Sequence, residues 1–222
     1  AEGLGQLRQA ISIDPDVSLA RALLGLISAF GAMLSLVPDG AAAERDAREE
    51  AEHAVALDPH APDVLGFAGC ALADVGYQAR GHELLLRALE LDPSNAQAHV
   101  AIGVVLTQAD RFDDGIKHMQ FGMRSSPRDF RLTFWAMILA NALARAGRFE
   151  EALATAENAS RRDASLYGAR VVAARVLQKL NRSGEARSAL DEARRIRPAL
   201  NLDEIRRFFG PKTADDLTPL WG

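Results

Sequence analysis

The side chains that could bind a metal or carry out catalysis are few, and their spacing suits neither role. No two of the five histidines have the His-Glu-x-x-His spacing that places zinc ligands on one helix face, and the single cysteine cannot form a Cys-x-x-Cys pair. Asp110, Asp113 and Asp114 precede Gly115, yet they lack the alternate spacing and the twelfth-position glutamate of a calcium loop. The sequence also has no phosphate-binding glycine loop and no Gly-x-Ser-x-Gly elbow. We therefore predict a protein that is not an enzyme and that needs no cofactor or metal.

The overall composition is that of an ordinary globular protein. The 222 residues are 48% hydrophobic and 25% charged, and the net charge is -4. Basic residues are not clustered, which argues against a direct interface with nucleic acid. The longest apolar stretch, residues 20–37, is broken by Arg21 and by glycines and serines, so we expect a buried helix there and no membrane span. The start of the sequence has no secretory signal pattern, and Cys70 has no cysteine to pair with, so we expect a cytoplasmic protein without disulfides.

Prolines recur along the chain at a fixed spacing. Pro59, Pro93 and Pro127 are each 34 residues apart, and each follows an apolar-periodic segment. Proline disfavours helical backbone at the residue before it, so these steps predict helix ends. The same kind of step occurs at Asp14-Pro15 and Arg197-Pro198, and Asp163-Ala164 is a degenerate step without proline.

A turn signal lies near the middle of each period. These signals are Gly76-Tyr77, Asp110-Arg111-Phe112, Gly147-Arg148-Phe149 and residues 181–184. Glycine and asparagine readily adopt the left-handed backbone that ends a helix, so each period predicts two helices joined by a short turn. The interval from Pro15 to Pro59 is 44 residues, and its extra residues, 30–41, predict a lengthened first helix and a longer turn.

This pattern resembles the tetratricopeptide repeat, a unit of 34 residues built from two helices. Small residues stand at the close-packing positions between the two helices, where larger side chains would overpack the core. These small residues are Gly69, Gly103, Ala140 and Ala174. The sequence departs from the family pattern where a large aromatic usually begins the first helix. Leu65, His99, Ala136 and Arg170 stand there instead.

The resemblance implies an all-α fold, a right-handed superhelical solenoid of antiparallel helix hairpins in a single domain over residues 1–222. It has about five repeats and a C-terminal capping helix. Asn201 is placed to cap a helix over residues 202–209, and residues 217–222 predict a tail with exposed apolar side chains. The expected segments are a half repeat (1–15), a repeat with an insertion (16–59), four further repeats (60–93, 94–127, 128–164 and 165–198) and the capping helix with its tail (199–222).

The chain is also similar, more loosely, to the C-terminal repeat regions of large bacterial regulatory proteins. In those proteins, such repeats follow a class III adenylate cyclase domain or a winged-helix DNA-binding domain. The residues that suggest this are the Ser126–Asp129 segment leading to Phe134-Trp135, and residues 208–221. The similarity implies a regulatory or sensory module of a larger bacterial protein.

The resemblance also implies where a partner would bind. In tetratricopeptide proteins the first helix of each hairpin lines a concave face, where ligands are usually held. The predicted partner-binding residues on that face are Phe67, Val100, Val104, Phe134, Met137, Ile138, Asn141, Arg145, Arg175 and Lys179. Asn141 stands where family members often use asparagine to bond a ligand backbone. The middle of the set is apolar and its C-terminal third is basic, so we expect an apolar partner segment with acidic character at one end.

One well-known ligand of the family is not expected. Members that bind chaperone tails hold a terminal carboxylate with lysine and asparagine. The equivalent positions here carry Leu23, Leu26, Phe67 and Cys70, which predicts against this ligand.

We expect a non-catalytic protein-interaction scaffold, and two alternatives stay open. The apolar residues of the concave face could be buried by neighbouring helices or by the chain's own tail. Alternatively, exposed ends of the solenoid could stack into a homodimer and drive oligomerisation of a parent adenylate cyclase or transcriptional regulator.

Overall fold

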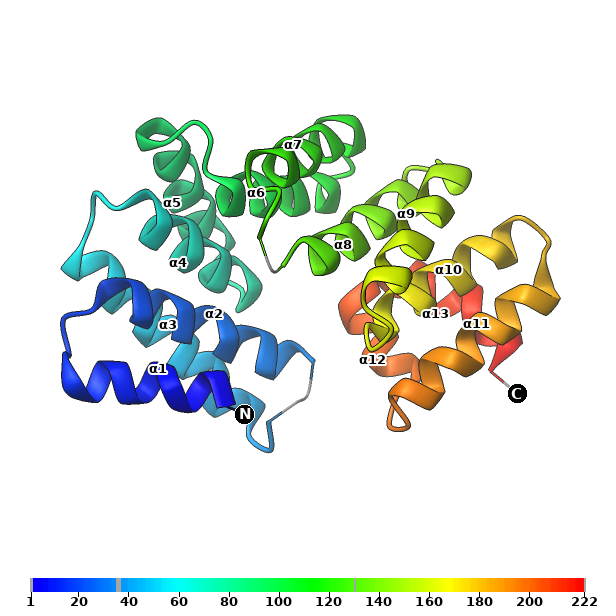
Figure 1. The fold of residues 1–222 in the computed structure, drawn as a ribbon, viewed down its shortest axis with the longest axis horizontal. Coiled ribbons are helices and arrows are strands. Elements are labelled where there is room, and N and C mark those ends of the chain that lie inside the picture. Colours follow the sequence, from blue (N-terminus) through cyan, green and yellow to red (C-terminus); the bar gives the residue numbers. More distant parts are fainter. Residues whose placement is uncertain (1, 35–36, 130, 222) are drawn as a thin grey trace. The chain divides into compact units, whose positions relative to one another are not determined.

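The computed structural model describes residues 2–34, 37–129 and 131–221 (Figure 1). The regular secondary structure of these residues consists of helices joined by turns. No strand occurs among these residues, so the predicted all-α fold class is confirmed. The elements in chain order are α1 (Glu2–Ile13), α2 (Ser18–Met33), α3 (Gly40–Leu57), α4 (Pro62–Asp74), α5 (Gln78–Leu91), α6 (Ala96–Gln108), α7 (Phe112–Ser125), α8 (Leu132–Arg145), α9 (Phe149–Arg162), α10 (Tyr167–Lys179), α11 (Ser183–Ile196), α12 (Leu202–Phe209), α13 (Pro211–Leu217) and the 3₁₀ turn η1 (Thr218–Leu220).

Four of the turns between helices share one backbone geometry. Each contains a residue with positive φ, and these residues are Gly76 (93°), Asp110 (58°), Gly147 (76°) and Asn181 (60°). The N–H of the following residue donates to the carbonyl five residues back over 2.8–2.9 Å. The accepting carbonyls belong to Leu72, Leu106, Leu143 and Leu177. This bond closes the C-terminus of each helix, so the predicted glycine and asparagine turns are confirmed and Asp110 adopts the same backbone.

Four other turns are built around an aspartate, at Asp14, Asp58, Asp92 and Asp163. Helices α5 and α9 end directly before Asp92 and Asp163. The side-chain Oδ1 of each accepts the backbone N–H two residues on, from Ser94 and Ser165, at 2.9 Å. Such a bond takes the place of the next backbone hydrogen bond of the helix, so the chain turns there. Asp163 therefore ends its helix as the Asp-Pro steps do, although no proline follows it.

The hairpin of α2 and α3 is longer than the others. Its helices have 16 and 18 residues, whereas α4 and α5 have 13 and 14. The Asp39 side chain starts α3 by accepting the N–H of Ala42 at 2.9 Å, as an N-cap does. The predicted lengthening of the first helix is confirmed. Ser35 and Leu36, in the predicted turn, lie outside the described residues.

Helices α4 and α5 approach each other through two glycines. A Cβ at Gly69 would lie 2.9 Å from the carbonyl oxygen of Gly81, and a Cβ at Gly81 would lie 2.5 Å from that of Gly69. Any side chain would force the helices apart, because protein interiors are packed as densely as organic crystals. Ala140 and Ala174 are likewise fully buried, as expected for close-packing positions.

The contacts divide the chain into two compact units, residues 1–105 and 106–222. In the first unit α2 packs on α3 and α4, and α4 packs on α5, around Leu65 and Leu85. In the second unit α10 packs on α8, α9 and α11, around Leu143 and Leu190. A single domain over residues 1–222, with its repeat boundaries, stays a prediction.

The C-terminal segment contains the predicted helix α12 and more structure than predicted. Asn201 caps α12 by accepting the N–H of Glu204 at 2.9 Å. Gly210, with φ of 93°, then separates α12 from α13, which packs on α10, while η1 packs on α11 (Figure 1). The expectation of exposed apolar side chains in the tail is wrong for Leu217 and Leu220, which are buried because α13 and η1 fold back onto the unit.

Candidate binding site

The predicted partner-binding residues lie on four helices and in both units. In the first unit, α4 carries Phe67 and α6 carries Val100 and Val104. The others belong to the second unit, on α8 (Phe134, Met137, Ile138, Asn141 and Arg145) and on α10 (Arg175 and Lys179).

The apolar candidates of the first unit contribute to its packing. Phe67 is half-buried and packs against the buried residues Ala22, Ala54 and Val64. Val100 is almost completely buried, and Val104 is half-buried. Val100 therefore serves the packing of this unit, whereas Phe67 and Val104 keep part of their surface exposed.

Two turns beyond Phe67, α4 carries a carboxyl group in an unfavourable environment. Burial raises the pKa of Asp74 from its ordinary value of 3.8 to about 7. The thiol of Cys70 donates a weak hydrogen bond to Asp74 Oδ2 at 3.7 Å, which offsets part of this effect. Near neutral pH this carboxyl group is divided between its charged and neutral forms.

The apolar candidates on α8 are covered in part by α12. The rings of Phe134 and Phe208 lie 6.3 Å apart between centroids. Met137 is only 2% exposed, and a Cβ at Gly168 would overlap its sulfur and lie 2.9 Å from the ring of Phe209. In this unit the chain's own C-terminal segment therefore covers Phe134 and Met137, whereas Ile138 is half-buried.

The basic candidates meet at a hollow in the second unit. Arg145, Arg175 and Lys179 line a space of about 380 Å³ beside α13. The rest of the wall comes from the turn after α8, the start of α9 and α13. These further lining residues are Ala144, Gly147, Phe149, Lys212, Asp215 and Asp216.

Asp216 of α13 holds two of the cations in place. Its Oδ2 accepts from Arg175 Nε at 3.0 Å, and its Oδ1 pairs with Lys179 Nζ at 2.5 Å. The Arg175 side chain is only 4% exposed, and its Nη1 is buried without a hydrogen-bond partner among the described residues. A buried donor without an acceptor costs free energy.

Arg145 is only partly compensated by its neighbours. Its Nη2 lies 3.6 Å from Asp110 Oδ1, and its guanidinium lies 5.3 Å from the ring centre of Phe112. Burial is the main effect that lowers the pKa of Arg145; Asp110 opposes this, and the charge of Arg175 lowers it further. Two arginines of like charge therefore share this side of the hollow.

Asn141, one turn before Arg145 on α8, is half-buried and partly unsatisfied. Its side-chain Oδ1 is buried and accepts no hydrogen bond from the described residues. An amide with spare bonding capacity at this position agrees with the role predicted for it, which stays a prediction.

Lys212, Asp215 and Asp216 were not predicted from the sequence. Each comes from α13, a helix of seven residues that lies outside the repeat pattern. Pro211 at its first position and the buried Ala214 and Leu217 are its sequence signals. The pairing of Asp216 with Arg175 spans 41 residues, and helix periodicity carries no information on such a contact.

A second ion pair fixes α12, which leads into α13. Glu204 is 3% exposed and accepts hydrogen bonds from Tyr167 Oη at 2.8 Å and from Arg197 Nε at 2.7 Å. Burial, together with the neighbouring carboxylate, raises the pKa of Tyr167 well above its ordinary value, so the phenol stays protonated and keeps donating. The C-terminal segment is thereby anchored by polar as well as apolar contacts.

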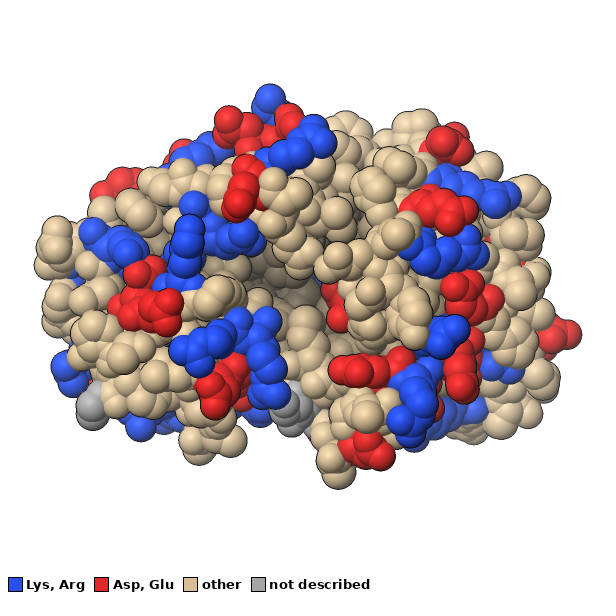
Figure 2. All heavy atoms as spheres, turned by 180° about the vertical axis from the view of Figure 1, so that it is seen from behind, with Lys and Arg blue, Asp and Glu red and all other residues tan. Residues whose placement is uncertain are grey.

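The surface and the described side chains show few other candidates. On the face in Figure 2, basic and acidic side chains are interspersed and neither forms a continuous field. Among the described residues, no group of three or more His, Cys, Asp and Glu side chains is placed to hold a metal ion. None of the described helices is both long and apolar enough to span a bilayer.

Comparison with known proteins relates the chain to helical repeats. The family model for the anaphase-promoting complex, cyclosome, subunit 3, matches residues 125–193. No curated protein matches the chain. The family match covers α8 to α10 and most of α11, which include the lining residues of the hollow other than those on α13.

Solved structures of two kinds of protein resemble the fold over most of the chain. The crystal structure of MamA superposes with a TM-score of 0.57 at 16% identity, covering 71% of this chain and 90% of that one. The crystal structure of YrrB, described as a TPR protein with an unusual peptide-binding site, gives a TM-score of 0.54 at 19% identity and covers 87% and 93%. At such identities the likeness concerns the fold. With its recurring turns and close-packed hairpins, the chain has the fold of a tetratricopeptide-repeat domain.

Proposed function

We propose that this chain is a non-catalytic scaffold for protein–protein interaction, and that the face formed by α8 and α10 holds a segment of the partner. The observation that carries this proposal is the hollow where Arg145, Arg175 and Lys179 meet. Its excess of cations suits an acidic group of the partner. YrrB, with a similar fold, is described as having a peptide-binding site, which is consistent with a polypeptide ligand here.

The predicted apolar residues divide into two groups under this proposal. Ile138 is half-buried and remains accessible to an apolar side chain of the partner. Phe134 and Met137 instead contact or lie against the α12 segment, so their effect on binding would act through that segment. The partner would therefore lie along α8 towards the hollow, with its acidic end at Arg145.

Selection of peptides tests this proposal directly. A displayed library of random twelve-residue peptides is panned on the protein, and the affinity of enriched peptides is measured for the wild type and for the double variant Asn141→Ala, Arg145→Ala. We expect enriched peptides to combine apolar and acidic residues, and the double variant to bind them about tenfold more weakly, as for the loss of one or two charge-assisted contacts.

A control variant separates a site effect from a general change of charge. Arg182 lies at the start of α11, pairs with Glu185 at 2.7 Å and does not line the hollow. Arg182→Ala should leave the peptide affinity unchanged. Equal affinities for the wild type and the double variant, with helicity intact in both, would remove α8 from the proposed site.

Self-association is a second candidate, favoured by apolar side chains at the N-terminal hairpin. Ile13 is 77% exposed and Leu19 is 41% exposed. Light scattering over a concentration series distinguishes the two candidates, because a self-assembling chain gains mass without any partner. A regulatory role within a larger bacterial protein, and a cytoplasmic location, also remain proposals that rest on the sequence.

A further inference from the structure

The hollow in the second unit carries an excess of positive charge. Arg145, Arg175, Lys179 and Lys212 line it, against only two carboxylates, Asp215 and Asp216. The residual charge of its lining is therefore two positive. A ligand with two negative charges would balance it, whereas a single carboxylate would balance half of it.

Asp216 already occupies the position from which a carboxylate can bond both Arg175 and Lys179. Asp216 bonds Arg175 Nε with one oxygen and pairs with Lys179 through the other. The donors that remain lie on three separate elements. They are Arg145 on α8, the further N–H groups of the Lys179 ammonium on α10 and Lys212 on α13.

Donors on three elements suit a tetrahedral anion better than a planar one. A phosphoryl group carries about two negative charges at neutral pH and has three strong acceptor oxygens, whereas a carboxylate offers two oxygens in one plane. We propose that this hollow binds a phosphoryl dianion, carried by a phosphorylated serine or threonine of the partner polypeptide. The identity of the carrier rests on the proposed function, whereas recognition of the phosphoryl group does not.

The wall that α13 contributes is a fixed part of the unit. Ala214 and Leu217 are fully buried, and the hydroxyl of Thr213 donates to the carbonyl of Phe209 at 2.8 Å. Moving α13 aside would expose these apolar side chains to water, which is unfavourable. The anion therefore enters beside α13, where Lys212 is exposed at the rim, and does not displace it.

Calorimetric titration with defined probes tests the proposal. The probes are inorganic phosphate and a capped five-residue peptide, Ala-Ala-Ser-Ala-Ala, used with phosphoserine, with serine and with glutamate at its centre. We expect phosphate and the phosphopeptide to bind, the serine peptide not to bind, and the glutamate peptide to bind at least about tenfold more weakly than the phosphopeptide. The affinity should fall as salt is added.

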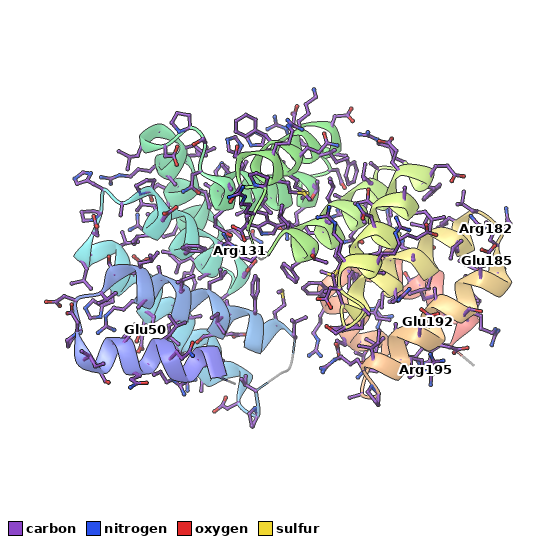
Figure 3. The ribbon with its side chains drawn as sticks, viewed as in Figure 1. Glu50, Arg131, Arg182, Glu185, Glu192 and Arg195 are labelled. Carbon is purple, nitrogen blue, oxygen red and sulfur yellow. The ribbon has the colours of Figure 1, made fainter. Side chains whose placement is uncertain are left out.

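Two substitutions at exposed positions change the charge of the hollow in opposite directions. Lys212→Glu lowers the residual charge to zero, and we expect phosphopeptide binding to weaken by about tenfold or more. Asp215→Asn raises the residual charge to three positive, and binding should become a few-fold tighter. Arg182→Ala is the matched control and should have no effect, because Arg182 and Glu185 lie together at the start of α11 (Figure 3).

Three results would overturn the proposal. Tighter binding of the glutamate peptide would make the hollow a carboxylate site. Absence of binding by both phosphate and the phosphopeptide would show that it takes no phosphoryl group, even if library peptides still bind. Phosphopeptide affinity that is equal in the wild type and in Lys212→Glu would place the anion elsewhere. Conversely, binding of inorganic phosphate without any enriched peptide would contradict the protein-scaffold function and leave the anion site standing.

Discussion

Arg175 is buried and Asp74 is half-buried, and the two charged groups are compensated to different extents. Arg175 is paired with Asp216, so its charge is retained inside the second unit. Asp74 has the Cys70 thiol as a weak donor, and its pKa is raised to about 7. A carboxyl group with a raised pKa is more stable in its neutral form, so the folded state loses stability as this group ionises.

The free energy of unfolding should therefore depend on pH through Asp74. Its stabilising contribution is fully present below about pH 4, where the group is protonated in both states, and is lost as the pH rises through 7. Asp74→Asn removes this titration. We expect the stability of the variant relative to the wild type to rise by about 2–3 kcal/mol between pH 5 and pH 8. Urea unfolding followed by circular dichroism at several pH values measures this.

Glu185→Gln provides the comparison for this experiment. The Arg182 guanidinium lowers the pKa of Glu185, so the stabilising effect of that carboxylate is present above its ordinary value of 4.5 and is lost only in more acidic solution. Its difference from the wild type should stay constant between pH 5 and 8. A constant difference for Asp74→Asn as well would contradict the assignment of the titration to Asp74.

At the scale of elements, α12 and α13 cover part of the face that α8 and α10 form and add to the walls of the binding site. Helix α12 covers Phe134 on α8, and α13 supplies one wall of the hollow. Both helices are short, so neither would be stable alone in water. Their order depends on packing against α8 and α10, and on the Asn201 cap at the start of α12.

Loss of this cap should loosen the C-terminal segment. Asn201→Ala removes the acceptor for the Glu204 N–H and should lower the free energy of unfolding by about 1 kcal/mol. Asn201→Asp keeps an acceptor at the same place and should retain most of the stability. Amide exchange over residues 202–217 should accelerate in the alanine variant. If the aspartate variant loses as much as the alanine variant, the cap is not the cause.

The sequence predicted elements that depend on local chemistry and missed those that depend on distant contacts. Helix ends at Asp92 and turns at Gly76 and Asn181 follow from the backbone preferences of those residues. Arg145, Arg175 and Lys179 were placed correctly on first helices because the period is regular. The Arg175–Asp216 pair could not be predicted, since nothing in a 34-residue period determines how a segment after the last repeat folds back.

For the whole molecule, the main feature is the division of its contacts into two compact units. Each unit has its own buried leucines, Leu65 in the first and Leu190 in the second. In repeat proteins each hairpin contacts mainly its neighbours, so stability is close to a sum of local terms. A defect in one unit should therefore affect that unit most.

Hydrogen–deuterium exchange of paired variants tests this independence. Leu190→Ala leaves a cavity in the second unit and should cost about 2–5 kcal/mol. Protection should fall mainly for amides of residues 106–222. Leu65→Ala should give the opposite distribution, with losses mainly in residues 1–105. Equal losses in both units for both variants would indicate one cooperative domain.

Both tryptophans of the chain belong to the second unit. Trp135 is buried with the Arg131 guanidinium 4.6 Å from its ring centre, and Trp221 is half-buried with that of Arg194 at 5.2 Å. Intrinsic fluorescence excited in the indole band therefore reports on residues 106–222 alone. A change of tryptophan emission during melting or ligand addition locates the event in that unit. Unchanged emission gives no information about the first unit. The protein thus carries a native optical label on the half that contains the hollow, and no dye is needed to follow it.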